Sequence, residues 1–368
     1  MSQVAVIGCG VVGAAIAYEL SLVVGLDVTL LDKQAPASGS TGAALGILMG
    51  AISHKTKGRS WRLRQTSMQR YETLIPELEA ITGEIIPFNR QGILMLRFNE
   101  EDEAQWDKLA AIRQSQGYNL ETWDRKQLQE KCPHIASDKI LGAIYSPQDR
   151  QVNPQILTTA LVAGAAKNGV NCRFGVVVEN VSSTALAGSN IRRCCQIHTS
   201  AGTIEVDWLV IAAGLGSTPL TASLAEKIDI RPVLGQALHL KLDRPIGNLD
   251  FQPIITGDDI HIVPLGGGEY WVGATVEFPD SAGEVVAQKE LLEQVKQQAI
   301  AYCPALADAI VINTWSGKRP RPEGQPAPII RELPGYSNVL LATGHYRNGV
   351  LLAPATALII RDMLTLPR

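Results

Sequence analysis

The chain begins with an apolar run that passes through a glycine-rich turn into a longer apolar stretch. Residues 4–7 are continuously apolar, as in a buried strand, and residues 11–20 are apolar or small except for Glu19, over a length typical of a helix. A second apolar run, residues 28–31, ends at Asp32. This order of strand, turn, helix and strand predicts a parallel βαβ unit.

The rest of the chain alternates between helical and strand patterns. Helices are predicted over residues 59–82, 100–117, 122–133, 153–169 and 287–304, and strands over residues 88–98, 172–181, 203–217, 230–242 and 261–278. Pro76 predicts a kink or a break in the first helix, whose arginines are expected to face solvent. Residues 312–330 are rich in proline and are predicted to be irregular. The pattern of residues 338–364 predicts a strand, a glycine-rich turn and a final helix.

The first turn has the spacing of a dinucleotide site. Gly8, Gly10 and Gly13 follow the Gly-x-Gly-x-x-Gly pattern. The first glycine allows a tight turn, the second lets the backbone approach a diphosphate, and the third lets the helix pack on the strand. Free N–H groups and the positive end of the helix then face the phosphates. Asp32 follows after about twenty residues, where its carboxylate can accept both hydroxyls of an adenosine ribose.

Two further segments are rich in small residues. Residues 34–52 form a Ser, Gly and Ala run without periodicity, which lets a backbone lie against a bulky ligand; the alternative is a flexible loop. The predicted strand over residues 203–217 contains Ala212, Ala213 and Gly214, a second place for close approach to a cofactor. These features follow the first turn in the same chain, an order that resembles flavoproteins with two dinucleotide folds and therefore favours FAD over a nicotinamide cofactor.

Composition narrows the class of ligand. The 368 residues suggest two or three domains, and the formal net charge of −3 includes no long basic or acidic run. We therefore expect neither nucleic acid nor a membrane surface as a partner. Glu19, Asp27 and the lack of a basic leader argue against a membrane span or a signal peptide at the start. The six cysteines show no Cys-x-x-Cys pair and no histidine at zinc-ligand spacing, so we expect reduced thiols, no metal and a cytoplasmic location.

The chain resembles the FAD-dependent amino acid oxidases of the D-amino acid oxidase type, and among them the glycine oxidases. The most specific segment is residues 342–356, ATGHYRNGVLLAPAT, and the first glycine motif, residues 40–50, residues 212–214 and residues 315–320 support it. The resemblance implies a mixed α/β fold with a Rossmann-like FAD-binding domain and a second, largely antiparallel-sheet substrate domain. The composition shifts assign residues 1–83, 145–230 and 319–368 to the first domain and residues 84–144 and 231–318 to the second.

The motif and the resemblance together imply FAD held without a covalent bond. The implied contacts are Gly8, Gly10, Val11, Val12, Gly13, Asp32, Lys33, Ser40, Thr41, Leu45, Gly46, Ile47, Val178, Gly214, His345, Tyr346, Arg347, Asn348, Gly349, Val350 and Leu351. Because the last helix is predicted to begin near Gly349, its positive end would face the flavin ring and stabilise the reduced, anionic form.

For the substrate, the resemblance implies that Arg319 binds a carboxylate, since a guanidinium offers two parallel donors. The alternative is a solvated arginine. Arg347 matches a second substrate-contacting arginine, or else it is a structural hydrogen-bond centre. His261 stands where glycine oxidases have a tyrosine that donates to the carboxylate, and its alternative is an ordinary histidine. This substitution leaves the identity of the substrate open.

The implied activity is oxidation of a small amino acid such as glycine, sarcosine or a D-amino acid. Hydride would pass to flavin N5, dioxygen would be the acceptor, and the products would be an oxo acid and hydrogen peroxide. Three alternatives stay open: a dehydrogenase with a quinone or protein acceptor, a nicotinamide-dependent dehydrogenase, and a flavin-binding protein without turnover. Whether the protein forms a homo-oligomer also stays open.

Overall fold

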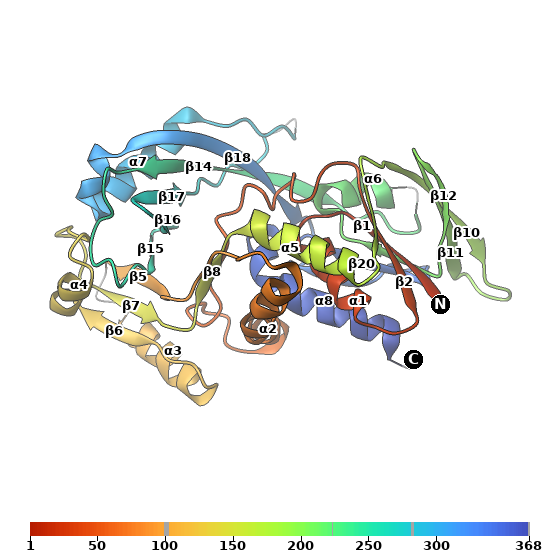
Figure 1. Ribbon diagram of the computed structural model, residues 1–368, viewed down its shortest axis with the longest axis horizontal. Helices are drawn as coiled ribbons and strands as arrows, with labels where there is room; N and C mark the ends of the chain where they lie inside the picture. Colours follow the sequence, from red (N-terminus) through yellow and green to blue (C-terminus); the bar gives the residue numbers. More distant parts are fainter. Residues whose placement is uncertain (99–102, 223, 281–282, 367–368) are drawn as a thin grey trace.

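The apolar runs of the sequence form the central strands of a six-stranded sheet. A computed structural model describes residues 1–98, 103–222, 224–280 and 283–366. The strand order is β19 (Ile329–Glu332), β20 (Val339–Thr343), β13 (Trp208–Ile211), β1 (Ser2–Ile7), β2 (Leu26–Asp32) and β9 (Asn171–Phe174). All neighbours are parallel except β19 and β20. The predicted βαβ unit therefore lies at the centre of this sheet (Figure 1).

Alternate residues of β1 face two different layers, as the period of a strand requires. Val4 and Val6 pack with helices α1 (Val11–Ser21), α2 (Gly58–Thr82), α5 (Pro154–Lys167) and α8 (Gly349–Thr365). Ala5 and Ile7 pack on the other face with a small sheet of β10 (Val178–Ala185), β11 (Arg192–Thr199) and β12 (Gly202–Glu205). The first sheet is therefore a buried middle layer.

An eight-stranded sheet lies beside this layered unit (Figure 1). Its order is β18 (Ile310–Pro322), β14 (Ile230–Lys241), β17 (Glu269–Gly273), β16 (Ile260–Gly266), β15 (Ile254–Gly257), β5 (Ile93–Arg97), β7 (Gly142–Ser146) and β6 (Glu121–Asp124). Within the part of the chain that the structure describes, only the pair β15 and β5 of this sheet is parallel. One face packs with α4 (Arg125–Lys131) and α7 (Lys289–Tyr302), while α3 (Glu103–Ser115) contacts β6. The mixed fold with a second, largely antiparallel sheet is confirmed.

Short elements connect the two large sheets. A three-stranded sheet consists of β3 (Ile47–Leu48), β8 (Arg150–Val152) and β4 (Phe88–Asn89). The remaining elements of the described residues are helix α6 (Ser217–Thr221) and short 3-10 helices at Gly214–Gly216, Pro304–Asp308 and Tyr346–Asn348. Among the described residues, no helix combines the length and the apolar character that crossing a membrane requires.

Three sequence predictions about local structure were wrong. Residues 312–322 belong to the long strand β18, because they pair with β14 along its whole length; only the remainder, up to β19, lacks a strand. The predicted strands over residues 172–181 and 203–217 are each divided between two sheets, and a left-handed Gly175 breaks the first. Of the predicted helix over residues 100–117, residues 100–102 lie outside the described residues. The domain boundaries stay a prediction, although β18 crosses the predicted one at residue 319.

Helix α2 also differs from expectation. It continues through Pro76 to Thr82, so the proline does not end it. Arg64 is 9% exposed, and Arg70 donates to the buried carboxylate of Glu19 with Nε 2.7 Å from Oε1. These two arginines therefore do not face solvent, because each is drawn to a polar partner beneath the helix.

Candidate active site

The turn between β1 and α1 requires its first and third glycines. Gly8 has a left-handed φ of 105°, and a Cβ there would lie 2.6 Å from the carbonyl oxygen of Ala212. A Cβ at Gly13 would overlap the carbonyl oxygen of Gly8, so only glycine lets α1 pack on the turn. At Gly10, a Cβ would meet only the hydroxyl of Thr41, at 3.1 Å. The turn thus keeps the backbone at the start of α1 open to a ligand.

Hydrogen bonds fix the side chains around this turn. Asp32 accepts from the amide of Cys9 through Oδ2 at 2.6 Å and from the amide of Gln34 through Oδ1 at 2.9 Å. The hydroxyl of Thr41 accepts from the amide of Val11 at 3.0 Å. Asp32 is therefore held at the end of β2, where the Rossmann arrangement places a ribose.

A cavity of about 1390 Å³ extends from this turn to the start of α8. Ordinary small-molecule pockets measure roughly 300–1,000 Å³, so this cavity has room for a dinucleotide and a substrate. The predicted site residues that line it are Gly8, Gly10, Val11, Val12, Asp32, Lys33, Ser40, Thr41, Leu45, Gly46, Ile47, Val178, Gly214, His261, Arg319, His345, Tyr346, Arg347, Asn348, Gly349 and Val350. Gly13 and Leu351 do not line it; Leu351 is buried in the core beneath. The role of each residue stays a prediction.

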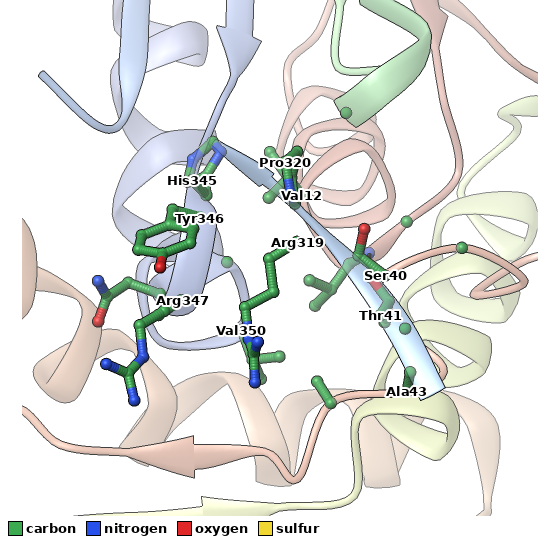
Figure 2. Close-up of a pocket in the computed structure, with 18 of the residues that line it drawn as sticks. Val12, Ser40, Thr41, Ala43, Arg319, Pro320, His345, Tyr346, Arg347 and Val350 are labelled. Atoms are coloured by element: carbon green, nitrogen blue, oxygen red, sulfur yellow. Dashed lines mark hydrogen bonds between the residues drawn. The ribbon is translucent and has the colours of Figure 1, made fainter. Parts of the chain in front are cut away.

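The turn before α8 closes the far end of the cavity. Tyr346 has a left-handed φ of 52°, and Figure 2 shows its side chain between those of His345 and Arg347. His345 is buried, and its Nε2 lies 2.9 Å from the hydroxyl of Thr356. Burial lowers the pKa of His345 to about 3, so its ring is neutral and holds the turn to the helix. Among the described residues, no side chain caps the start of α8, whose positive end meets the cavity.

Arg319 reaches into the cavity from β18 (Figure 2). Its Nη1 donates to the carbonyl of Leu234 on the neighbouring strand at 3.0 Å. Burial lowers its pKa, and the nearby charge of Arg347 lowers it further. No carboxylate among the described residues forms an ion pair with Arg319. The guanidinium therefore offers its other donors to a ligand.

His261 lies on β16 and lines the same cavity. Its Nδ1 is 2.8 Å from the hydroxyl of Thr256 on β15. Burial, and then the charges of Arg347 and Arg319, lower the pKa of His261 to about 4. The ring is therefore neutral at pH 7 and can act as a hydrogen-bond donor or acceptor but carries no charge.

Arg347 forms an ion pair with Asp259, in the turn between β15 and β16. Its Nη2 lies 3.1 Å from Oδ1, and the side chains of Arg347 and Asp259 are 35% and 68% exposed. This partner fits the structural alternative considered for Arg347, but the residue also lines the cavity. Its contact with a substrate stays a prediction.

The small-residue loop over residues 38–44 is fastened to the strand that carries Arg319. The hydroxyl of Ser40 donates to the carbonyl of Lys318 at 2.6 Å, and Nε1 of Trp315 donates to the carbonyl of Ala43 at 3.0 Å. A Cβ at Gly317 would overlap the side chain of Ala43. The predicted cofactor loop is thus in direct contact with the strand that carries Arg319.

One wall of the cavity consists of residues that the sequence analysis did not predict to be part of the site. The segment that includes Met49, Ile52 and His54 lines it. The buried carboxylate of Asp149 accepts from the amides of residues 50, 51 and 52 at 2.7, 2.8 and 2.8 Å. The buried Arg113 donates to the carbonyls of residues 51, 53 and 55. No local sequence signal marks these two residues, because their partners are far away in the chain.

Arg64 is a further lining residue that sequence analysis missed. Its Nη1 donates to the carbonyl of Ser60 at 3.1 Å and its Nη2 to Oδ1 of Asn348 at 3.5 Å. A signal did exist, since Arg64 lies on the buried stripe of α2 with Trp61, Met68 and Tyr71. Among the described residues, no group of three or more His, Cys, Asp or Glu side chains could hold a metal ion.

Known proteins resemble the chain over nearly its whole length. It is 30% identical to the bifunctional protein ThiO/ThiG of Nostoc sp., over 98% of this chain and 52% of that relative, so it spans about half the length of such relatives. It is 28% identical to a glycine oxidase of Bacillus licheniformis, over 98% of this chain and 92% of the relative. The crystal structure of glycine oxidase from Geobacillus kaustophilus matches with a TM-score of 0.86 and 26% identity, over 100% of this chain and 96% of that one.

The sequence model of the FAD dependent oxidoreductase family, DAO, matches residues 3–363. This match and the glycine oxidase relatives confirm the family resemblance inferred from the sequence, the broad class of FAD-dependent oxidoreductase, and FAD as the cofactor. The absence of a covalent bond to FAD stays a prediction. The chain therefore belongs to the DAO family of FAD-dependent oxidoreductases.

Proposed function

We propose that the protein oxidises a small amino acid, such as glycine, sarcosine or a D-amino acid, with dioxygen as the electron acceptor. The observation that carries this proposal is the guanidinium of Arg319, which enters the cavity without a carboxylate partner among the described residues. The same cavity reaches the dinucleotide turn. A substrate with a free carboxylate would supply the missing partner.

The residues that line the cavity fit FAD. The Gly8 turn keeps the backbone of α1 open, Asp32 is held at the ribose position, and the positive end of α8 faces the other end of the cavity. Bound FAD supplies the hydride acceptor and returns the electrons to dioxygen. The protein contributes binding, orientation and electrostatics.

The chain's own residues would orient the substrate. Arg319 would hold the carboxylate through two N–H donors, which fixes where the Cα–H bond points. His261 is neutral at pH 7 and would add a hydrogen bond without a second charge. No protein base is required if the amine binds in its neutral form, because the nitrogen lone pair assists the loss of hydride.

The overall reaction balances with the amino acid, water and dioxygen as its only reactants. The amino acid loses a hydride from Cα and a proton from nitrogen to give an imine, and water hydrolyses the imine to an oxo acid and an amine or ammonia. Dioxygen takes up the two electrons with two protons to give hydrogen peroxide. The glycine oxidases among the relatives support this reaction class for the present chain.

Anaerobic titration of the purified holoprotein with glycine, sarcosine and D-amino acids tests the proposal. We expect at least one of them to bleach the flavin absorbance, and admission of air to restore it with formation of hydrogen peroxide. A protein that a substrate bleaches but that only a quinone or a dye reoxidises would be a dehydrogenase. Flavin that no amino acid reduces would refute the proposal.

A further inference from the structure

Two glycines stand opposite each other in the strands beside Arg319. Gly235 of β14 and Gly317 of β18 are register partners, and both line the cavity. Neither has a left-handed φ, so backbone conformation does not demand glycine at either position. Glycine within a strand is destabilising relative to alanine and often marks a close approach by another group. The approaching group differs between the two.

At Gly235 the approaching group is the guanidinium of Arg319. A Cβ there would lie 2.5 Å from Cζ of Arg319 and closer still to both Nη atoms. Arg319 pairs with Val233, and residue 235 is the next position on the same face of β14. The guanidinium therefore lies on bare backbone, where its Nη1 donates to the carbonyl of Leu234. At Gly317, by contrast, a Cβ would overlap Ala43 of the small-residue loop.

We infer that Gly235 is a positioning residue for carboxylate recognition, because it provides the bare strand surface on which the guanidinium of Arg319 rests. An added methyl group would lift the guanidinium off β14, break its bond to Leu234 and move its free donors within the cavity. The inference rests on the proposed function, since it assumes that Arg319 binds the substrate's carboxylate. A fixed, half-buried guanidinium loses less side-chain freedom on binding than a mobile one.

The test compares Gly235→Ala with the wild-type holoprotein. Acetate and benzoate serve as probes, and the perturbation of the flavin spectrum reports their dissociation constants. We expect both dissociation constants to rise at least tenfold and KM for the amino acid to rise with them, while kcat changes less. Unchanged dissociation constants would overturn the inference.

Gly317→Ala is the matched control. It makes the same change at the register partner, but its methyl group meets the small-residue loop rather than Arg319. We expect it to weaken FAD retention and to leave acetate and benzoate affinity within about threefold of wild type at saturating FAD. Equal losses of carboxylate affinity in both variants would indicate general damage to the strands and would overturn the inference.

The double variant separates positioning from a merely structural role. In an Arg319→Ala background the obstructing guanidinium is gone, so Gly235→Ala should fold, bind FAD and leave the already weakened carboxylate affinity unchanged. If Gly235→Ala alone fails to fold but the double variant folds, the clash with Arg319 is established; if both fail, the inference is wrong. Wild-type protein and Arg319→Ala that bind carboxylates equally would instead refute the proposed role of Arg319.

Discussion

Arg347 and Asp259 form an ion pair with Nη2 3.1 Å from Oδ1, although 88 residues separate them in the chain. The pair joins the turn before α8 to the turn between β15 and β16 at the edge of the cavity. Both side chains are partly exposed, so the pair contributes less than about 1 kcal/mol to stability. Its main effect is electrostatic, because Asp259 offsets one positive charge beside Arg319.

Replacing Asp259 by asparagine should therefore tighten the binding of carboxylates. The substitution removes a negative charge that repels an anion and competes for Arg347. We expect the dissociation constant of acetate to fall severalfold in the holoprotein, with a change in unfolding free energy below about 1 kcal/mol. Asp258→Asn, at the neighbouring position, where the carboxylate accepts from the hydroxyl of Tyr302, should have the smaller effect. Weaker acetate binding in Asp259→Asn would contradict this reasoning.

Arg319→Met should remove most carboxylate binding. Truncating one partner of a buried charge pair costs about 2–5 kcal/mol, and we expect a loss of that size in the binding of the amino acid. Arg319→Lys keeps the charge but loses the parallel donors, so it should recover only part of the affinity. Steady-state kinetics with glycine and sarcosine measure both variants. An unaltered KM in Arg319→Met would remove this residue from the site.

His261→Tyr should shift the preference of the enzyme toward glycine, because the resemblance implies that glycine oxidases have a tyrosine at this position. The comparison is the ratio of kcat/KM for glycine to that for sarcosine and for D-alanine. His261→Phe is the matched control, since it keeps a ring but removes the donor and should not produce the same shift. An identical substrate profile in wild type and His261→Tyr would exclude a substrate role for His261.

His345 should make the protein less stable in acid. Its pKa is about 3 in the folded protein against 6.5 as the ordinary value, so the unfolded chain binds a proton between these values that the folded protein does not. Unfolding free energy therefore rises with pH across this window, by up to about 1.4 kcal/mol per pH unit for one group. Urea unfolding at pH 5 and pH 7 should show a shallower pH dependence in His345→Gln.

Asp149→Asn should loosen the wall of the cavity. Asp149 accepts three amides, and an asparagine would direct its own N–H groups at one or more of them. Hydrogen bonds to charged groups are worth about 1.5–3 kcal/mol each, so we expect a loss of at least about 2 kcal/mol in unfolding free energy. Faster proteolysis of residues 49–56 should accompany it. Asp138→Asn, at a fully exposed carboxylate, should leave stability nearly unchanged.

The parts of the site that could be predicted from the sequence are those encoded by a local pattern of residues. The glycine spacing, the acid at the end of β2 and the glycine-rich turn before α8 depend on neighbours in the chain, and the structure places the first turn, Asp32 and Gly349 around one cavity. The extent of β18 was missed because its prolines, including Pro320, argue for irregular structure, whereas an edge strand tolerates them.

The wall formed by residues 49–55 could not be found in the same way. Asp149 and Arg113 lie about 98 and 62 residues from the backbone that they bind, and nothing in either local sequence signals a partner. Arg64 could have been found, since it interrupts an apolar stripe at a buried position of α2. A charged residue on such a stripe points either to a buried polar partner or to a ligand cavity.

The hydroxyl of Ser40 donates to the carbonyl of Lys318, the residue next to Arg319. The loop that we expect to contact the flavin is thus attached to β18, the strand that carries the guanidinium. We therefore expect the occupancy of the flavin site and the affinity for carboxylates to be coupled through this one contact.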